Sequence, residues 1–174
     1  PAGLTIGETY YLRVYSYGTA VQTTNFNVCV GTLPAPPAND DCANAIAATM
    51  PYNNSQDATS ATNNAGFITA CSPAANDGVW YTVVGDGANI TINVTNVVGW
   101  DARISVYTGA CGAFNCVGTV DASTTNETYT ITNSIVGTTY YINVGQYSGT
   151  TNNPEGPFTI DITTTLSSNS FDNA

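Results

Sequence analysis

Carboxylates make up almost the whole chemical repertoire of this chain, because its 174 residues include no His and no Lys. Without them, a Ser or Cys nucleophile lacks its usual general base, and no amine can form a Schiff base. Only a carboxylate pair, as in glycoside hydrolysis, remains as catalytic machinery. The 12 acidic residues are scattered, mostly in turn-like segments where Asp shapes the backbone. The sequence therefore predicts a protein without enzymatic activity.

Calcium is the ligand that these carboxylates suit best, since Ca²⁺ takes oxygens from carboxylates, amides and backbone carbonyls. Four residues open the main domain or precede predicted strands: Asp40, Asp41, Asp77 and Asp101. If a β-sandwich gathers these strand starts, the four can share an ion. Capping and turn formation explain each Asp separately, and no EF-hand spacing is present. Calcium is therefore the one cofactor that the sequence suggests.

The five cysteines favour an oxidising compartment and therefore an extracellular or cell-surface location. We expect Cys111 and Cys116 to close a small hairpin loop, and Cys42 and Cys71 to tie the start of the domain to an early loop. Cys29 is then left as a free thiol or an intermolecular bridge, or it pairs with Cys42. The alternative is a set of free, buried thiols.

The net charge of −10 excludes two classes of partner. Nucleic-acid binding and attraction to anionic lipid both need clustered basic side chains, and the cations are only Arg13 and Arg103. No apolar run is long enough to predict membrane insertion.

Tyrosines offer a possible glycan platform, because their faces stack on sugars. Tyr11, Tyr15 and Tyr17 share one strand parity, and Tyr141 and Tyr147 occupy matching positions later in the chain. Such a row binds glycan or packs against a neighbouring module, and we favour packing. The opposite parity holds Tyr10, Leu12 and Val14, which are better core candidates.

An internal repeat defines the elements that must position these residues. The segment Gly7–Val14 returns as Gly137–Val144, and residues 25–28 are echoed by residues 157–160. The matched segment closes the second copy but opens the chain. Residues 1–33 therefore resemble the last two strands of an incomplete copy, a β-hairpin. Residues 34–38 form a Pro-rich linker, and residues 39–165 form one complete copy.

Alternation of apolar and polar residues predicts strands throughout the complete copy, as in Ile90, Ile92 and Val94. Further strands are expected at 66–69, 78–84, 102–108, 115–120, 128–132, 138–147 and 158–163. One short capped turn is expected near 39–46. The pattern is typical of an all-β protein, an antiparallel β-sandwich of jelly-roll type.

Four blocks carry a family resemblance: Pro36–Cys42, Gly78–Tyr81, Trp100–Cys111 and Gly137–Tyr141. They resemble repeat modules of secreted Bacteroidota surface proteins, substrates of type 9 secretion. The resemblance implies a β-sandwich strung in tandem on extracellular enzymes and adhesins. Residues 166–174 are similar to the linker toward a type 9 sorting domain that is removed on cleavage.

These observations predict a non-catalytic, extracellular structural or adhesion module. One alternative is a subunit of an extracellular filament assembled by strand exchange through residues 1–33. Another is a carbohydrate-binding module. The expected partners are a neighbouring repeat or an identical subunit, with surface glycans in the third case.

Overall fold

The structure is a computed structural model that describes residues 5, 7–15, 17, 25–31, 34–62, 68–72, 78–95, 97–122, 126–147 and 155–165. The chain divides into two compact units, Pro1–Thr32 and Leu33–Ala174. The division falls beside the linker predicted at residues 34–38. The C-terminal residues 166–174 lie outside the described part.

The second unit consists of strands and one short 3₁₀ turn. The turn η1 covers Cys42–Asn44, and the strands are β1 (Ile46–Ala47), β2 (Tyr52–Asp57), β3 (Val79–Val84), β4 (Asn89–Thr95), β5 (Ala102–Ala110), β6 (Ala113–Val120), β7 (Glu127–Ile131), β8 (Thr139–Gln146) and β9 (Pro157–Thr165).

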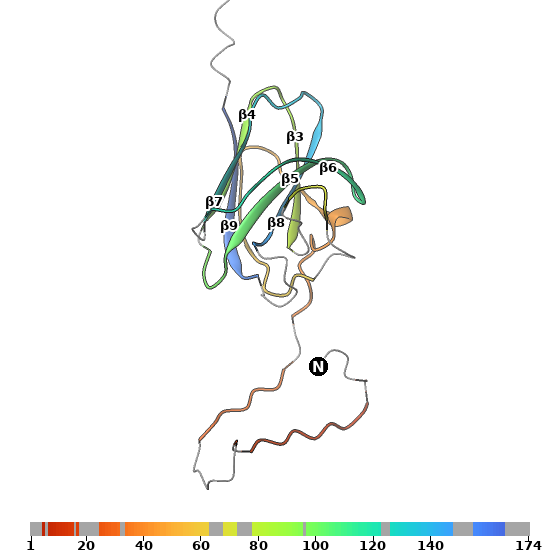
Figure 1. The fold of residues 1–174 in the computed structure, drawn as a ribbon, viewed down its shortest axis with the longest axis vertical. Helices are drawn as coiled ribbons and strands as arrows, with labels where there is room; N and C mark the ends of the chain where they lie inside the picture. The colour runs from red at the N-terminus through yellow and green to blue at the C-terminus, as the bar shows by residue number, and fades with distance from the viewer. Residues whose placement is uncertain are drawn as a thin grey trace, which may run out of the picture. The chain divides into compact units, whose positions relative to one another are not determined.

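These strands form two stacked sheets (Figure 1). The five-stranded sheet has the order β1-β3-β8-β5-β6, and the four-stranded sheet has the order β2-β9-β4-β7. All pairs are antiparallel except β1 with β3. From β1 to β9 the chain changes sheet at every connection except the β5–β6 hairpin. The predicted all-β sandwich is therefore confirmed, and its jelly-roll type stays a prediction.

Strand periodicity builds the core between the sheets, because every second side chain points inward. Ile90, Ile92 and Val94 of β4 are fully buried, as their alternation predicts. They meet inward rows from the other sheet and from β9: Val79, Tyr81, Val83, Ala102, Ile104, Val106, Ile142, Val144, Phe158, Ile160 and Ile162. Seven predicted strands are confirmed as β3 to β9.

The sequence pattern did not predict two strands, β1 and β2, and it predicted one strand that the structure shows only as a bridge. The edge strand β2 reads Tyr-Asn-Asn-Ser-Gln-Asp, with only half-buried positions on its inner side. Such a sequence has no apolar alternation to detect. The two-residue β1 is too short to show any. The strand expected at 66–69 is reduced to an isolated bridge at Ile68, with residues 63–67 outside the described part.

The described residues of the first unit do not form the expected hairpin, since residues 7–15 and 25–31 contain no paired strand. The row predicted to face inward is exposed: Tyr10, Leu12, Val14, Phe26, Val28 and Val30. A hairpin without a packed face is marginal in water. The repeat nevertheless leaves a structural trace. Thr5 N–H donates to Tyr10 Oη (2.7 Å), as Ile135 N–H donates to Tyr140 Oη (2.9 Å).

Candidate functional site

Four of the five cysteines form two disulfides, but the pairing predicted from spacing is wrong. Cys42 bonds to Cys111 and Cys71 bonds to Cys116. The exposed Cys29 is a free thiol. Both bridges therefore join the segment before β3 to the β5–β6 hairpin, and neither closes a local loop. Two disulfides place the folded chain in an oxidising compartment outside the cytoplasm.

Hairpin register explains the error. Ala110 pairs with Ala113, so Cys111 sits at the tip of the turn, whereas Cys116 lies farther down β6, paired with Tyr107. Cysteines at the tip and on the strand face different neighbours. The five-residue spacing between Cys111 and Cys116 did not reveal this difference, because the sequence alone does not show where the hairpin turn lies.

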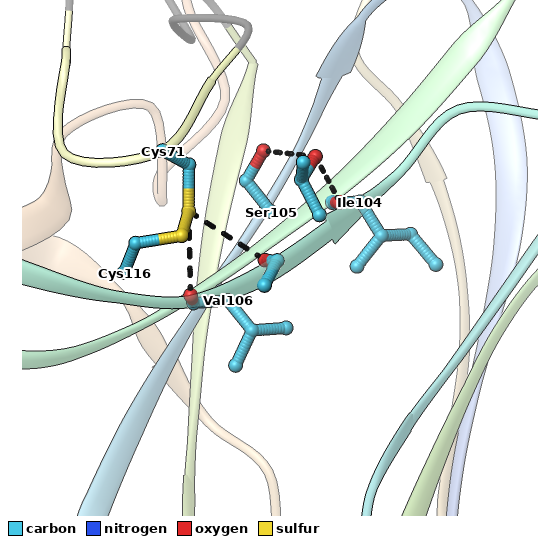
Figure 2. Close-up of a disulfide and its surroundings, with 7 residues drawn as sticks. Cys71, Ile104, Ser105, Val106 and Cys116 are labelled. Atoms are coloured by element: carbon cyan, nitrogen blue, oxygen red, sulfur yellow. Dashed lines mark hydrogen bonds between the residues drawn. A yellow bond between two sulfur atoms is a disulfide. The ribbon is translucent and has the colours of Figure 1, made fainter.

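The disulfides cover a second, smaller core on the outer face of the five-stranded sheet. Trp80 and Tyr107 are fully buried there, and Phe114 stacks on Trp80 with ring centroids 5.3 Å apart. Cys71 Sγ lies 3.8 Å from the carbonyl oxygen of Val106 and 3.7 Å from that of Gly118 (Figure 2). A disulfide sulfur has no proton to donate, so these are packing contacts. This assembly, defined as the disulfide clamp, consists of the two bridges and the aromatic residues beneath them.

The clamp also settles the roles of several aromatic residues. Trp80 and Trp100 are buried core residues. Tyr141 packs edge-on against Phe114, with ring centroids 5.4 Å apart, so it belongs to the clamp. Tyr11, Tyr15 and Tyr17 are highly exposed, and Tyr147 is partly exposed. The tyrosine row considered as a possible glycan platform therefore loses Tyr141, one of its two members in the complete copy.

The outer face of the four-stranded sheet is a polar ladder with no aromatic side chain among its described residues. Ser55 and Thr159 hydroxyls are 3.1 Å apart across β2 and β9, and Thr91 and Thr130 hydroxyls are 3.2 Å apart across β4 and β7. Thr128 donates to Asn93 Oδ1 at 2.9 Å. Neutral hydrogen-bonded pairs across the strands thus make this surface polar although it has few charges.

The three predicted calcium ligands that the structure describes, Asp40, Asp41 and Asp101, do not form one site. Asp40 accepts hydrogen bonds from the backbone N–H (2.7 Å) and hydroxyl (2.5 Å) of Thr62, which is a structural role. Asp41 precedes η1 as an exposed residue without a side-chain capping bond. Asp77 lies outside the described residues. Of the three described residues, only Asp101 belongs to a group of neighbouring carboxylates.

That group consists of Asp101, Asp121 and Glu127, each with one carboxylate oxygen within 4.8 Å of the others. Asp101 precedes β5 on the β4–β5 connection, Asp121 follows β6 on the β6–β7 connection, and Glu127 is the first residue of β7. Both connections cross between the sheets at the same end of the sandwich, and Val97 N–H donates to Asn126 Oδ1 between them (3.4 Å). Sequence reasoning missed Asp121 and Glu127, because the β5–β6 register places Asp121 beside Asp101 and the β4–β7 register places Glu127 there.

Burial and repulsion act together on these carboxyl groups. Burial raises the pKa of Asp101, and the charge of Asp121 raises it further. Burial also raises the pKa of Glu127, against the hydrogen bond from Ala122 N–H and with the repulsion of the two aspartates. Arg103 is the nearby cation; burial lowers its pKa, while Tyr107 and Asp121 raise it. The carboxyl groups of Asp101 and Glu127 are therefore harder to ionise than they are in water.

Comparisons with known proteins identify no relative: no family model matches the chain, and no curated protein or solved structure is significantly similar. Among the described residues, no helix is long and apolar enough to cross a membrane.

Proposed function

We propose that this protein is a non-catalytic, extracellular structural or adhesion module, the second unit of which is held rigid by its disulfides. The disulfide clamp is the observation that carries this proposal. Its two bridges interlock along the chain, since Cys71 lies inside the loop closed by Cys42 and Cys111, and Cys116 lies outside it. A fold cross-linked in this way suits a location without chaperones or reductants.

The energetic effect of the clamp is large for a domain of this size. In the chain-entropy model, closing either loop, with sequence separations of 69 and 45 residues, stabilises the fold by about 4 kcal/mol. The clamp also covers the outer face of β5 at Tyr107, which leaves this strand buried on both sides there. This cross-linked and doubly covered sheet supports a structural role, in which the module keeps its fold while it is bound to a surface or to a neighbouring module.

The carboxylate group gives no support to a glycosidase. A retaining or inverting mechanism places a sugar between two carboxylates and needs both to be reachable. Glu127 is only 2% exposed, and one of its oxygens binds Ala122 N–H at 2.9 Å. A substrate therefore has no access to this carboxylate.

Immunolabelling of intact source cells tests the location and role together. We expect antibodies against the folded chain to label unpermeabilised cells, and a strain lacking the protein to attach less well to surfaces. Labelling only after permeabilisation contradicts an extracellular module. Normal attachment in the deletion strain contradicts adhesion.

A second candidate, a filament subunit, is supported by the exposed apolar row of the first unit. Tyr10, Leu12 and Val14 repeat the inward pattern of Tyr140, Ile142 and Val144, which complete a sheet in the second unit. A strand with this pattern can complete an open sheet in another copy, and head-to-tail contacts that do not close propagate. Exposed Cys29 can then form a bridge between copies.

Negative-stain electron microscopy and non-reducing electrophoresis test this alternative. Filaments, with a Cys29-dependent dimer band, support it. Isolated particles at all concentrations, with a monomer band, contradict it. The substitution Cys29→Ser is the matched control for the band.

A further inference from the structure

We propose that Asp101, Asp121 and Glu127 bind a Ca²⁺ ion that joins the β4–β5 and β6–β7 connections at one end of the sandwich. The inference rests on three observations: the geometry of the group, the unpartnered oxygens within it, and its unbalanced charge. It goes beyond the structural role proposed above, because it assigns a ligand to a specific site.

Geometry fits a cation of the size of calcium. With metal–oxygen bonds of about 2.3–2.6 Å, two oxygens on opposite sides of Ca²⁺ are about 4.6–5.2 Å apart. The three carboxylate oxygens lie within 4.8 Å of one another, so one ion can touch all three. The ligands are all hard oxygen donors, which favours calcium over zinc or copper.

Two buried oxygens of the group have no hydrogen-bond partner among the described residues and are free to bind a cation. Glu127 Oε2 and Asp101 Oδ1 are buried and accept no hydrogen bond from any described residue. Glu127 itself is 98% buried, and its carboxylate belongs to the group. Buried polar atoms in native proteins almost always have a partner. Gln146, paired with Ala102 at the same end of β5, carries a further buried side-chain oxygen without a partner.

The charge of the group, when its carboxylates are ionised, also favours a bound cation. Arg103 and Asp121 each lie one residue beyond the Ile104–Val120 pair, and their charges attract. Three ionised carboxylates and one guanidinium still leave a net charge of −2. Arg103 donates to the Tyr147 carbonyl at 3.1 Å, so part of its donor capacity is used elsewhere. A divalent cation neutralises the remainder.

The site also has a structural consequence. Asp101 lies on the connection from the four-stranded sheet to the five-stranded sheet, Asp121 lies on the return connection, and Glu127 opens β7 of the four-stranded sheet. One ion bound to all three would cross-link the two sheets at the β4–β5 and β6–β7 connections. Binding is therefore expected to raise the melting temperature.

The test uses the full chain, first stripped with chelator and then titrated with calcium. Calcium sites of extracellular modules have Kd values of about 0.1–1 mM, so about 10 mM calcium should raise Tm by about 5–10 °C over the chelator value. Isothermal calorimetry should show one ion bound per chain. Terbium, a calcium substitute, should luminesce on tryptophan excitation, because Trp100 adjoins Asp101 in the sequence.

Isosteric variants locate the ion. Asp101→Asn and Glu127→Gln should each abolish the calcium-dependent rise in Tm, while their Tm in chelator equals or exceeds that of the wild type, because a buried charge has been removed. Asp41→Asn, which changes an exposed acid outside the group, should keep the full rise.

Two results overturn the proposal. An unchanged wild-type Tm with no calorimetric heat means that the carboxyl groups are balanced by a retained proton. A calcium-dependent rise that persists in both Asp101→Asn and Glu127→Gln means that the ion binds elsewhere. If either variant fails to fold, terbium luminescence of Asp121→Asn decides, with loss of signal expected.

Discussion

Two segments of this chain share one sequence pattern and have opposite environments. Tyr10, Leu12 and Val14 are 53%, 71% and 51% exposed, whereas Tyr140, Ile142 and Val144 at the matching positions are 4%, 0% and 0% exposed. The second set lies in β8, paired with β3 on one side and β5 on the other. The first set has no paired strand among the described residues.

The turn before each segment is the same in both copies. Gly7 and Gly137 both adopt positive φ, +88° and +77°, which favours glycine. In both copies, a Tyr hydroxyl accepts a hydrogen bond from the backbone N–H five residues earlier. Local sequence therefore suffices for the turn. The strand needs neighbouring strands and an apolar surface, which the second unit supplies and the described residues of the first unit do not.

The largest difference between the copies is expected from a buried charge. Ile142→Asp places a carboxylate in the core between the sheets and should cost about 5 kcal/mol or more, enough to unfold a marginally stable domain. Leu12→Asp, at the matching exposed position, should leave the free energy of unfolding nearly unchanged. Urea denaturation followed by tryptophan fluorescence measures both. Equal losses would show that the two segments are equally buried.

Disulfide removal should have the next largest effect. The double variant Cys71→Ala/Cys116→Ala opens the clamp and should lower the free energy of unfolding by about 4 kcal/mol. Cys29→Ser in the first unit should have no effect, because this thiol is exposed and unbonded. Calorimetry of the two variants, with and without reductant, makes the comparison. If the double variant is as stable as the wild type, the disulfide clamp does not contribute substantially to the stability of the fold.

The sequence predicted features that depend on neighbouring residues, and it did not predict those that depend on contacts between residues far apart in the chain. Alternation found β3 to β9, because burial of Ile90, Ile92 and Val94 is encoded residue by residue. The disulfide pairing and the Asp101 group depend on hairpin register and on which connections meet, which a single sequence does not reveal. Polar β2 was invisible because its inward positions are Tyr52, Asn54 and Gln56.

A smaller effect is expected from the shared turn. Tyr140→Phe removes the acceptor for Ile135 N–H in the sandwich and should cost about 1 kcal/mol. Tyr10→Phe removes the equivalent bond to Thr5 N–H, which is exposed, so the unfolding transition should not move. Thermal denaturation of the two variants side by side is the measurement. An equal shift would mean that the first turn is part of the same cooperative unit.

The smallest effect on stability is expected from the exposed apolar row of the first unit, which bears on assembly. The double variant Leu12→Ser/Val14→Ser removes apolar side chains that are exposed in the single chain, so its stability should stay within about 0.5 kcal/mol of the wild type. A loss above about 1.5 kcal/mol would show that this row is buried, against its own sandwich or another copy, since burying such side chains is worth that much. Sedimentation velocity separates the two cases. If the row is buried by strand exchange between copies, the wild type should show a faster sedimenting species, and the stability difference between wild type and variant should grow with protein concentration.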